Sequence, residues 1–471
     1  MNINPYIFRG YDLRGIVDKD LYREIVEYLG KAYGTFLIKR SIKKAVVGHD
    51  CRLTGEAYSN AIIKGIISCG VDVFDIGIAL AGNIYFSQYY FGSPGCVSIS
   101  GSHNPAEYNG FKFGTGFSST MVGDEIQELR QIAEKGEFIQ GNGKLEKRDI
   151  KEEYFNDLVK KSGAPFNFKV VIDPSNSTPG FFAPELLKKA GCQVICNNCE
   201  LDGTFPLGTP DPTEKKVAER LSKKILEEKA DIGFSYDSDG DRIGVVDDKG
   251  NILWNDILVA LFSADALERN PGGKIVFNTL CSKVVQDVIS AKAGQAIMWR
   301  TGHSFIKAKA QQEKAAFAGE LSGHFYFLDK FYPHDDGLFS SLALLNYLSR
   351  AKKPLSQIIS DLPQYISSPE IKVGCPDELK VDLMKKIGEK LRQDFPAAEI
   401  IDDERAGDGV RLEMENSMFI IRYSQNGPYL TIKFEAKVQD KYDELKNYIS
   451  ALLHTYSEID WSFGVNVESL E

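Results

Sequence analysis

Three aspartates alternate with small residues in the stretch SYDSDGDRIGVVDD: Asp237, Asp239 and Asp241. In an extended loop alternate side chains point the same way, so we expect the three carboxylates to converge. Their mutual repulsion requires a cation, and this number of hard oxygen ligands suits Mg²⁺. The sequence therefore predicts a metal site at these three aspartates.

Two other interpretations of this acidic stretch are weaker. A calcium-binding EF-hand loop also begins D-x-D-x-D, but it needs Gly at its sixth position, where this chain has Arg242. EF-hand loops also lie between helices, whereas both flanks here are apolar and predict strands. A solvated acidic turn commonly holds two aspartates, but three of them beside an arginine favour a metal site.

A serine and a histidine stand side by side where a strand-like run ends in VSISGSHNP: Ser102 and His103. The neighbouring Gly, Asn and Pro account for a turn but not for these two residues. The stretch lacks the G-x-S-x-G elbow of a hydrolase nucleophile. A phosphoryl carrier fits better, because a phosphoserine adds about two negative charges and three oxygens, one of which could complete the shell of a metal.

Two further polar loops have functional and plain interpretations that both stay open. In GELSGH, Glu320 and Ser322 could hold two sugar hydroxyls, although a glycine-rich turn with a helix cap is also possible. In IRYSQNGPYL, several donors could bind a phosphate on a turn that also suits a β-hairpin. The candidate donors of this second loop are Arg422, Ser424, Gln425 and Asn426.

Strand-like and helical stretches alternate around these motifs. Strands at 43–50, 71–77 and 95–100 alternate with helices at 55–70 and near 84–91, and the pattern restarts at 168 and at 273. This alternation predicts three similar α/β domains with mixed sheets, at 1–148, 149–251 and 252–364. A helix at 377–392, close strands through 409–436 and a helix at 439–454 predict a C-terminal α+β domain at 365–471.

The polar loops of the α/β domains follow predicted strands. Ligands of open α/β sheets bind beyond the carboxyl ends of the strands, so these loops are the expected binding positions. The composition is typical of a soluble globular protein: 471 residues, 43% hydrophobic and 26% charged, with a formal net charge of -10. The negative charge argues against a nucleic-acid partner but allows a small anionic substrate. No signal peptide and no apolar run of about eighteen residues is visible, so we expect no membrane span and a cytoplasmic location.

Eight cysteines are scattered along the chain, and we expect them to be reduced. Cys192, Cys196 and Cys199 lie close enough in sequence to hold a metal or an iron–sulfur cluster. No fourth ligand lies near them, so the favoured interpretation is small buried residues in a strand and an Asn-rich turn.

Five motifs follow one another in an order that resembles the α-D-phosphohexomutase family, most closely its bacterial phosphomannomutase/phosphoglucomutase branch. They are FRGYDLRG (8–15), GSHNP followed by YNGFK (108–112), DSDGDR, GELSGH and RYSQNGP. The resemblance covers nearly the whole chain and implies four domains around a central cleft. It also implies that hexose 1-phosphate and hexose 6-phosphate are interconverted through a phosphoserine and a bisphosphorylated sugar.

The resemblance assigns roles to individual residues. Ser102 would be the phosphoserine and, with Asp237, Asp239 and Asp241, would bind one Mg²⁺ per chain. The residues implied around the transferring phosphoryl group are Tyr11, Arg14, His103, Lys112 and Arg242, with His303 assisting proton transfer. The residues implied in substrate binding are Glu320, Ser322 and His324 for the sugar, and Arg422, Ser424, Gln425 and Asn426 for the distal phosphate. Hexose 1,6-bisphosphate would be the activator, sugar phosphates the partners, and the enzyme a monomer or weak dimer.

Some positions depart from the usual family pattern. Ser238 replaces a glycine of the metal loop, Asn426 a threonine, and Leu280 stands where a basic residue is common. Ala81-Gly82 stands where Thr-Pro is common. The tail from 458 to 471 could serve either packing or oligomer contact.

Three functions remain open from sequence. The first is a mutase for mannose and glucose phosphates, which Leu321 in GELSGH favours over the second, a glucosamine phosphate mutase. The third is a metal-dependent sugar phosphatase or a binding protein that has lost turnover. The complete set of Ser102, three aspartates and Arg242 argues against lost activity, whereas mutase and phosphatase differ in the exclusion of water.

Overall fold

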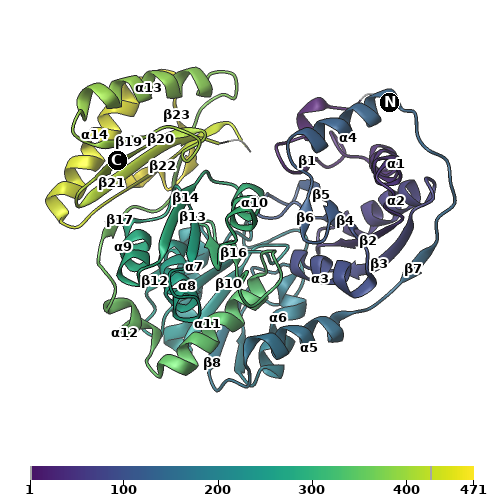
Figure 1. The fold of residues 1–471 in the computed structure, drawn as a ribbon, viewed down its shortest axis with the longest axis horizontal. Coiled ribbons are helices and arrows are strands. Elements are labelled where there is room, and N and C mark those ends of the chain that lie inside the picture. The colour runs from purple at the N-terminus through teal and green to yellow at the C-terminus, as the bar shows by residue number, and fades with distance from the viewer. Residues whose placement is uncertain (1–2, 425–426, 471) are drawn as a thin grey trace. The chain divides into compact units, whose positions relative to one another are not determined.

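The fold is described from a computed structural model for residues 3–424 and 427–470 (Figure 1). The chain divides into two compact units. The first comprises the chain up to Ile252 together with Lys330–Leu355, and the second comprises Leu253–Asp329 and the chain from Ser356 onward. Within the described residues, no helix has the length and apolar character needed to span a bilayer.

The first sheet of the first unit is mixed, with the order β1-β5-β4-β2-β3-β7 and a short β6 on β5. Strands β4, β2, β3 and β7 run parallel, and β5 pairs antiparallel with both β4 and β1. The bounds are β1 Leu13–Ile16, β2 Lys44–His49, β3 Asp72–Ile78, β4 Gly95–Ile99, β5 Tyr108–Gly116, β6 Ser119–Thr120 and β7 Leu145–Lys147. A short 3₁₀ helix, Pro5–Ile7, precedes β1.

Alternate residues of this sheet face one group of helices. Ala45 and Val47 of β2 and Phe111 and Phe113 of β5 share a core with α1 (Arg23–Lys39), α2 (Gly55–Ile67) and α4 (Asp124–Lys135). Because strand side chains alternate, the intervening residues face the other side, where α3 (Ala81–Phe91) contacts β2 and β4. The sheet is therefore covered by helices on both faces.

The second sheet of the first unit has the order β12-β11-β10-β8-β9. Strands β10, β8 and β9 are parallel, and β11 pairs antiparallel with β10. The strand bounds are β8 Lys169–Asp173, β9 Gln193–Cys196, β10 Ile232–Tyr236, β11 Ile243–Val246 and β12 Ile252–Leu253. The helices of this part are α5 Lys151–Ser162, α6 Pro179–Lys189, α7 Lys215–Glu228 and α11 Gly337–Ala351.

The second unit contains one mixed and one antiparallel sheet. The mixed sheet has the order β14-β13-β15-β16, with β16 antiparallel to β15. Its elements are β13 Lys274–Asn278, β14 Gln295–Trp299, β15 Phe317–Gly319, β16 Phe325–Tyr326, α8 Asn255–Arg269, α9 Lys283–Ala291 and α10 His303–Glu313.

The antiparallel sheet forms the C-terminal part, with the order β19-β20-β21-β22-β18-β23 and β17 on β22. Its strands are β17 Ile366–Ser367, β18 Ile371–Gly374, β19 Glu399–Ile401, β20 Gly409–Met414, β21 Ser417–Tyr423, β22 Tyr429–Ala436 and β23 Asp460–Val465. The helices are α12 Leu355–Ser360, α13 Lys380–Asp394, α14 Gln439–His454 and a final 3₁₀ turn, Val467–Ser469. The tail left open by the sequence thus adds β23 to this sheet by pairing with β18.

The three mixed sheets repeat one arrangement. In each, a parallel strand turns back into an antiparallel neighbour: β4 into β5, β10 into β11, and β15 into β16. The connecting segments are the Ser102 loop (residues 100–107), the aspartate loop (237–242) and the Glu320 loop (320–324). Three of the motifs found in the sequence therefore lie at equivalent positions, beyond the carboxyl ends of parallel strands.

The predicted fold class is confirmed: three α/β domains with mixed sheets precede an antiparallel α+β domain. The expected start of one helix near residue 84 was wrong, because α3 begins at Ala81. The backbone N–H of Ala81 donates to the carbonyl of Asp239, which gives this otherwise unsatisfied first-turn donor a partner. The four domain boundaries stay predictions.

Candidate active site

The candidate nucleophile Ser102 lies in the first unit, buried at 3% exposure. Its Oγ donates to Asp237 Oδ2 at 2.8 Å and lies 3.2 Å from Nδ1 of His103. Its backbone has a φ of +47°, a left-handed conformation that is uncommon for a residue with a side chain. The structure thus brings the predicted phosphoserine against the first of the three predicted metal ligands.

The three aspartates of the aspartate loop converge as predicted, but through a different geometry. Asp237, Asp239 and Asp241 are buried, and each offers one carboxylate oxygen within 4.8 Å of the others. The loop is a turn, with Gly240 at a φ of +66°, and not the extended segment from which we inferred convergence. The side chains meet because the backbone reverses direction between β10 and β11.

Lys112 of β5 supplies a buried cation to this cluster. Its Nζ donates to Asp239 Oδ2 at 2.8 Å and to Asp241 Oδ2 at 2.6 Å. Burial disfavours the ammonium, but the two carboxylates raise the pKa of Lys112 well above its ordinary value. Burial also acts to raise the pKa of Asp239, yet Lys112 outweighs it and keeps that pKa below its usual range. Burial and the neighbouring Asp239 raise the pKa of Asp241 to about 6.

Arg242 ends the aspartate loop and binds back to it. Its Nε donates to Asp237 Oδ2 at 3.1 Å, and its Nη1 donates to Asp211 Oδ1 at 3.3 Å. Its Nη2 is buried and has no hydrogen-bond partner among the described residues. A buried guanidinium nitrogen with unused donors is suited to bind an anionic oxygen.

Arg14 and Tyr11 come from the segment around β1. Arg14 Nε donates to Asp12 Oδ2 at 2.7 Å, and its Nη1 donates to Asn104 Oδ1 of the Ser102 loop at 3.1 Å. Tyr11 is buried in the same segment. Burial opposes the charge of Arg14, but Asp12 raises its pKa above the ordinary value, so the side chain stays a cation beside the loop.

The donor set of this cluster fits a divalent metal. Asp239 Oδ1 is buried and has no hydrogen-bond partner within residues 3–424 and 427–470. Burial and the neighbouring Asp241 raise the pKa of Asp237 well above its usual range, so Asp237, like Asp241, is destabilised as an anion. A divalent cation would stabilise all three in ionised form, and carboxylate and serine oxygens are the hard ligands that Mg²⁺ prefers.

The Glu320 loop brings a second group of predicted residues together in the second unit. Glu320 is buried, and its Oε2 accepts the backbone N–H of Gly302 at 3.2 Å. His303 follows as the first residue of α10, and its ring stacks on that of His324, with centroids 5.3 Å apart. Ser322 is half-buried in the same loop. A carboxylate, two imidazoles and a hydroxyl thus gather at the carboxyl end of β15.

The predicted phosphate loop lies at the end of β21. Arg422 Nε donates to Asp408 Oδ1 at 2.8 Å, and its Nη2 pairs with Asp408 Oδ2. A phosphate contact through this side chain would therefore use Nη1 or the second N–H of Nη2. Ser424 is buried next to it, whereas Gln425 and Asn426 lie outside the described residues.

Sequence reasoning missed three charged residues that hold these loops. Lys380 of α13 donates to the carbonyls of Ser424 and Gly427, and Asp50 and Arg52 bind the Ser102 loop. One signal could have found the pair, because DCRL follows β2, a parallel strand next to β4. Lys380 lies more than forty positions from its loop and gave no signal.

Two other sequence interpretations can be compared with the structure. Leu280, which stands in place of a basic residue, is buried. Cys192 is buried as expected, but Cys199 is only half-buried and Cys196 is exposed at the end of the edge strand β9, so the expectation of buried cysteines was wrong for these two. Within the described part of the chain, the cysteines do not form a group of three metal-ligating side chains.

Known proteins with similar sequences point to the same family. Residues 5–140, 152–250 and 254–365 match the models for the phosphoglucomutase/phosphomannomutase alpha/beta/alpha domains I, II and III. A phosphomannomutase/phosphoglucomutase of Pseudomonas putida is 35% identical over 458 residues and covers 97% of both chains. A phosphoglucomutase of Neisseria meningitidis is 35% identical over 463 residues, covering 98% of this chain and 99% of the relative.

A solved structure of the same family has a similar fold. A phosphoglucomutase/phosphomannomutase family protein of Burkholderia thailandensis superimposes with a TM-score of 0.86 at 32% identity, covering 94% of this chain and 96% of the other. The chain therefore belongs to the phosphoglucomutase/phosphomannomutase family of enzymes. The resemblance stated from the sequence, and with it the expectation of a phosphohexomutase, is confirmed.

Proposed function

We propose that the chain interconverts the 1- and 6-phosphates of glucose and mannose by passing a phosphoryl group between Ser102 and the sugar. One observation carries the proposal. Ser102 Oγ lies 2.8 Å from Asp237 Oδ2, at the edge of a buried cluster of three carboxylates, so a nucleophile and a candidate metal site meet. The names of the relatives from Pseudomonas putida and Neisseria meningitidis support the choice of sugars.

In the first half-reaction the bond between Ser102 Oγ and phosphorus breaks, and a bond forms between phosphorus and the free hydroxyl of the sugar monophosphate. The hydroxyl gives up a proton, for which we assign His303 as acceptor, and Ser102 Oγ takes up a proton from Asp237 or His103, the groups beside it. The product is a hexose 1,6-bisphosphate.

In the second half-reaction the bisphosphate presents its other phosphoryl group. Ser102 Oγ attacks it and forms a bond to phosphorus, while the bond between phosphorus and the sugar oxygen breaks. The sugar oxygen takes up the proton held by His303, and the serine proton has an acceptor at Asp237 Oδ2, with His103 Nδ1 as a second candidate at 3.2 Å. Negative charge develops on the phosphoryl oxygens in both halves. We assign the cations Lys112, Arg14 and Arg242 and the hydroxyl of Tyr11 to its stabilisation.

One Mg²⁺ per chain would be held by Asp237, Asp239, Asp241 and an oxygen on Ser102. When bound, it would withdraw electron density from the phosphoryl group and stabilise the charge that develops there. The ionised carboxylates orient that oxygen, and Lys112 keeps Asp239 and Asp241 in place through its two hydrogen bonds.

Recognition of the substrate is assigned to the second unit. We propose that Glu320, Ser322 and His324 bind the sugar hydroxyls, because desolvated hydroxyls require paired donors and acceptors. The phosphate that does not react would be bound by Arg422, Ser424, Gln425 and Asn426, with Lys380 holding the loop. The bisphosphate activator, the cytoplasmic location and the monomeric or weakly dimeric state stay predictions.

The proposal is tested by assaying glucose, mannose and glucosamine 1-phosphates side by side, with Mg²⁺ and a trace of glucose 1,6-bisphosphate. We expect 6-phosphates from glucose and mannose, loss of activity in EDTA and recovery on adding Mg²⁺. Release of inorganic phosphate without isomerisation would identify a phosphatase and overturn the proposal. Preferential turnover of glucosamine 1-phosphate would reassign the substrate.

A further inference from the structure

Arg52 lies in the turn after β2 and is buried at 3% exposure, so each of its donors needs a partner. An arginine has five N–H donors, and all five have acceptors here. Nε donates to Asp50 Oδ2 at 3.2 Å. The other four donate to backbone carbonyls: Nη2 to Ser102 at 2.7 Å and Asn104 at 2.6 Å, and Nη1 to Pro105 at 2.6 Å and Tyr108 at 2.8 Å.

These four carbonyls belong to the Ser102 loop and to the first residue of β5. The loop curves around the guanidinium, which serves as its hydrogen-bonding centre. Gly101 makes the approach possible, because a Cβ there would lie 2.6 Å from Arg52 Cζ. The ring of Phe205 closes the other side, with its centroid 4.9 Å from that carbon.

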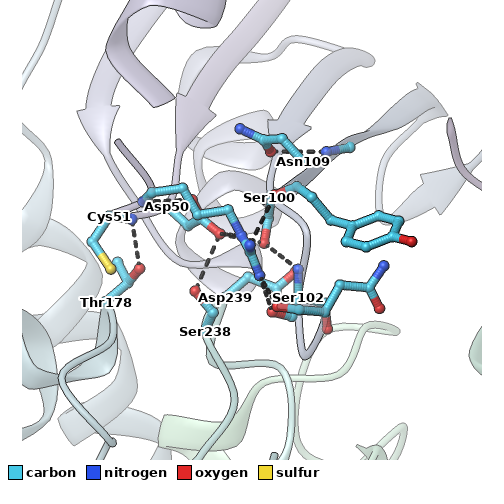
Figure 2. A network of polar contacts seen from close by, with 12 residues as sticks. Asp50, Cys51, Ser100, Ser102, Asn109, Thr178, Ser238 and Asp239 are labelled. Atoms are coloured by element: carbon cyan, nitrogen blue, oxygen red, sulfur yellow. Dashed lines mark hydrogen bonds and ion pairs between the residues drawn. The ribbon is translucent and has the colours of Figure 1, made fainter. Parts of the chain in front are cut away.

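Asp50 balances the charge of Arg52 and extends the network to Ser102. Its Oδ2 accepts the hydroxyls of Ser100 at 2.7 Å and of Ser238 at 3.1 Å. Ser100 Oγ in turn accepts the backbone N–H of Ser102 at 2.7 Å (Figure 2). Ser238 belongs to the aspartate loop, so one carboxylate joins the nucleophile's loop to the loop of the candidate metal ligands.

The backbone of Ser102 is thus fixed on both sides. Its N–H is held through Ser100 and its carbonyl through Arg52, in a left-handed conformation that a serine seldom adopts unaided. We propose that Arg52 and Asp50 are positioning residues for phosphoryl transfer, which hold the backbone of Ser102 so that Oγ points at Asp237. The inference rests on the proposed function and adds to it the part of the chain that aims the nucleophile.

The geometry requires an arginine at this position. Lysine carries three donors on one nitrogen and lacks the planar fork that reaches four carbonyls and a carboxylate together. In Arg52→Lys at least two of these five acceptors lose their donor, and the loop can move away from Asp237. A displacement of the nucleophile of about 1 Å is enough to lower a rate by roughly 10²-fold.

The experiment compares Arg52→Lys with Arg220→Lys. Arg220 of α7 is a matched control, since it also pairs with a buried aspartate, Asp173, and with a neighbouring hydroxyl. For Arg52→Lys we expect kcat to fall about 10²-fold with little change in the KM for sugar phosphate, and slower phosphorylation of Ser102 by glucose 1,6-bisphosphate. For Arg220→Lys we expect a lower Tm and a kcat within about twofold of the parent.

Equal losses of kcat in the two variants at matched Tm would show a general structural effect and overturn the inference, as would full activity of Arg52→Lys. If Arg52→Lys does not fold, Ser100→Ala removes one hydroxyl from the same network, and we expect a fall of about tenfold in kcat. Unchanged kcat in that variant would then overturn the inference. An assay of the parent enzyme distinguishes the proposed function from the positioning role of Arg52 and Asp50. If the parent does not isomerise sugar phosphates, the proposed function itself is wrong.

Discussion

The Ser102 loop and the Glu320 loop occupy equivalent places in two repeated sheets, but they are held in different ways. The Ser102 loop is bound from outside by a buried guanidinium and faces a cluster of buried charges. The Glu320 loop is closed by its own backbone, with the N–H of Glu320 on the carbonyl of His324 and that of Gly323 on the carbonyl of Glu320, both at 3.0 Å. The same position in the fold thus places a nucleophile beside several buried charges in the first unit. In the second unit it places one carboxylate in a loop that its own backbone hydrogen bonds close.

The largest loss of activity is expected when the nucleophile of the Ser102 loop is removed. Ser102→Ala should lower kcat by about 10³-fold or more, because no other hydroxyl would accept the phosphoryl group. The Tm should stay close to that of the parent, since the backbone contacts of residue 102 remain. Steady-state kinetics with glucose 1-phosphate measure the loss, and an active variant would contradict the assignment.

The next effect concerns the carboxylates opposite that serine. Asp239→Asn should lower kcat by about 10²-fold and raise the Mg²⁺ concentration needed for half-maximal activity, because an amide is a weaker ligand than a carboxylate. Titration of activity with Mg²⁺ measures both. Asp124→Asn, at an exposed position on α4, is the control and should leave the titration unchanged. A parental Mg²⁺ requirement in Asp239→Asn would remove this residue from the metal site.

A smaller and different effect is expected in the Glu320 loop. Glu320→Gln should lower kcat/KM for sugar phosphates by about tenfold, mainly through KM, because the variant loses a charged acceptor for a hydroxyl. Phosphorylation of Ser102 should still occur, as its own loop is intact. If Glu320→Gln abolished phosphorylation of Ser102 while KM stayed constant, the contrast between the two loops would be wrong.

The smallest effect is on stability, away from both loops. Asp336 caps α11 by accepting the N–H of Phe339, and it accepts the hydroxyl of Tyr154 at 2.7 Å. Gly82 lets it approach α3, since a Cβ there would lie 2.3 Å from Oδ2. Burial raises the pKa of Asp336 to about 7.

The sign of the pH effect follows from that raised pKa. The unfolded chain has an ordinary aspartate pKa of about 3.9, so the folded state binds more protons between these values and loses stability as pH rises. Asp336→Asn removes this titration, and its Tm relative to the parent should therefore increase from pH 5 to pH 8. A constant difference across this range would show that Asp336 does not titrate as stated.

Much of this site could be predicted from the sequence, because its polar motifs directly follow strands that are recognisable from their apolar residues. The convergence of the aspartates was also predicted, although the reason differed: a turn at Gly240, and not an extended loop, brings them together. Asp50 and Arg52 were not assigned from the sequence, although they follow a predicted strand, because their contacts with residues 100–108 depend on the pairing of β2 with β4. The pairing of Arg422 with Asp408 likewise depends on strand register, since Gly409 lies opposite Arg422.

The most direct test of the account is to locate the transferred phosphoryl group. The purified enzyme is incubated with glucose 1,6-bisphosphate and analysed by intact mass and peptide mapping. The phosphorylated enzyme is then mixed with glucose 6-phosphate and analysed again. We predict one added phosphoryl group per chain, on Ser102, which leaves the protein as a hexose bisphosphate. A phosphoryl group on another residue, or one released only to water, would contradict the account.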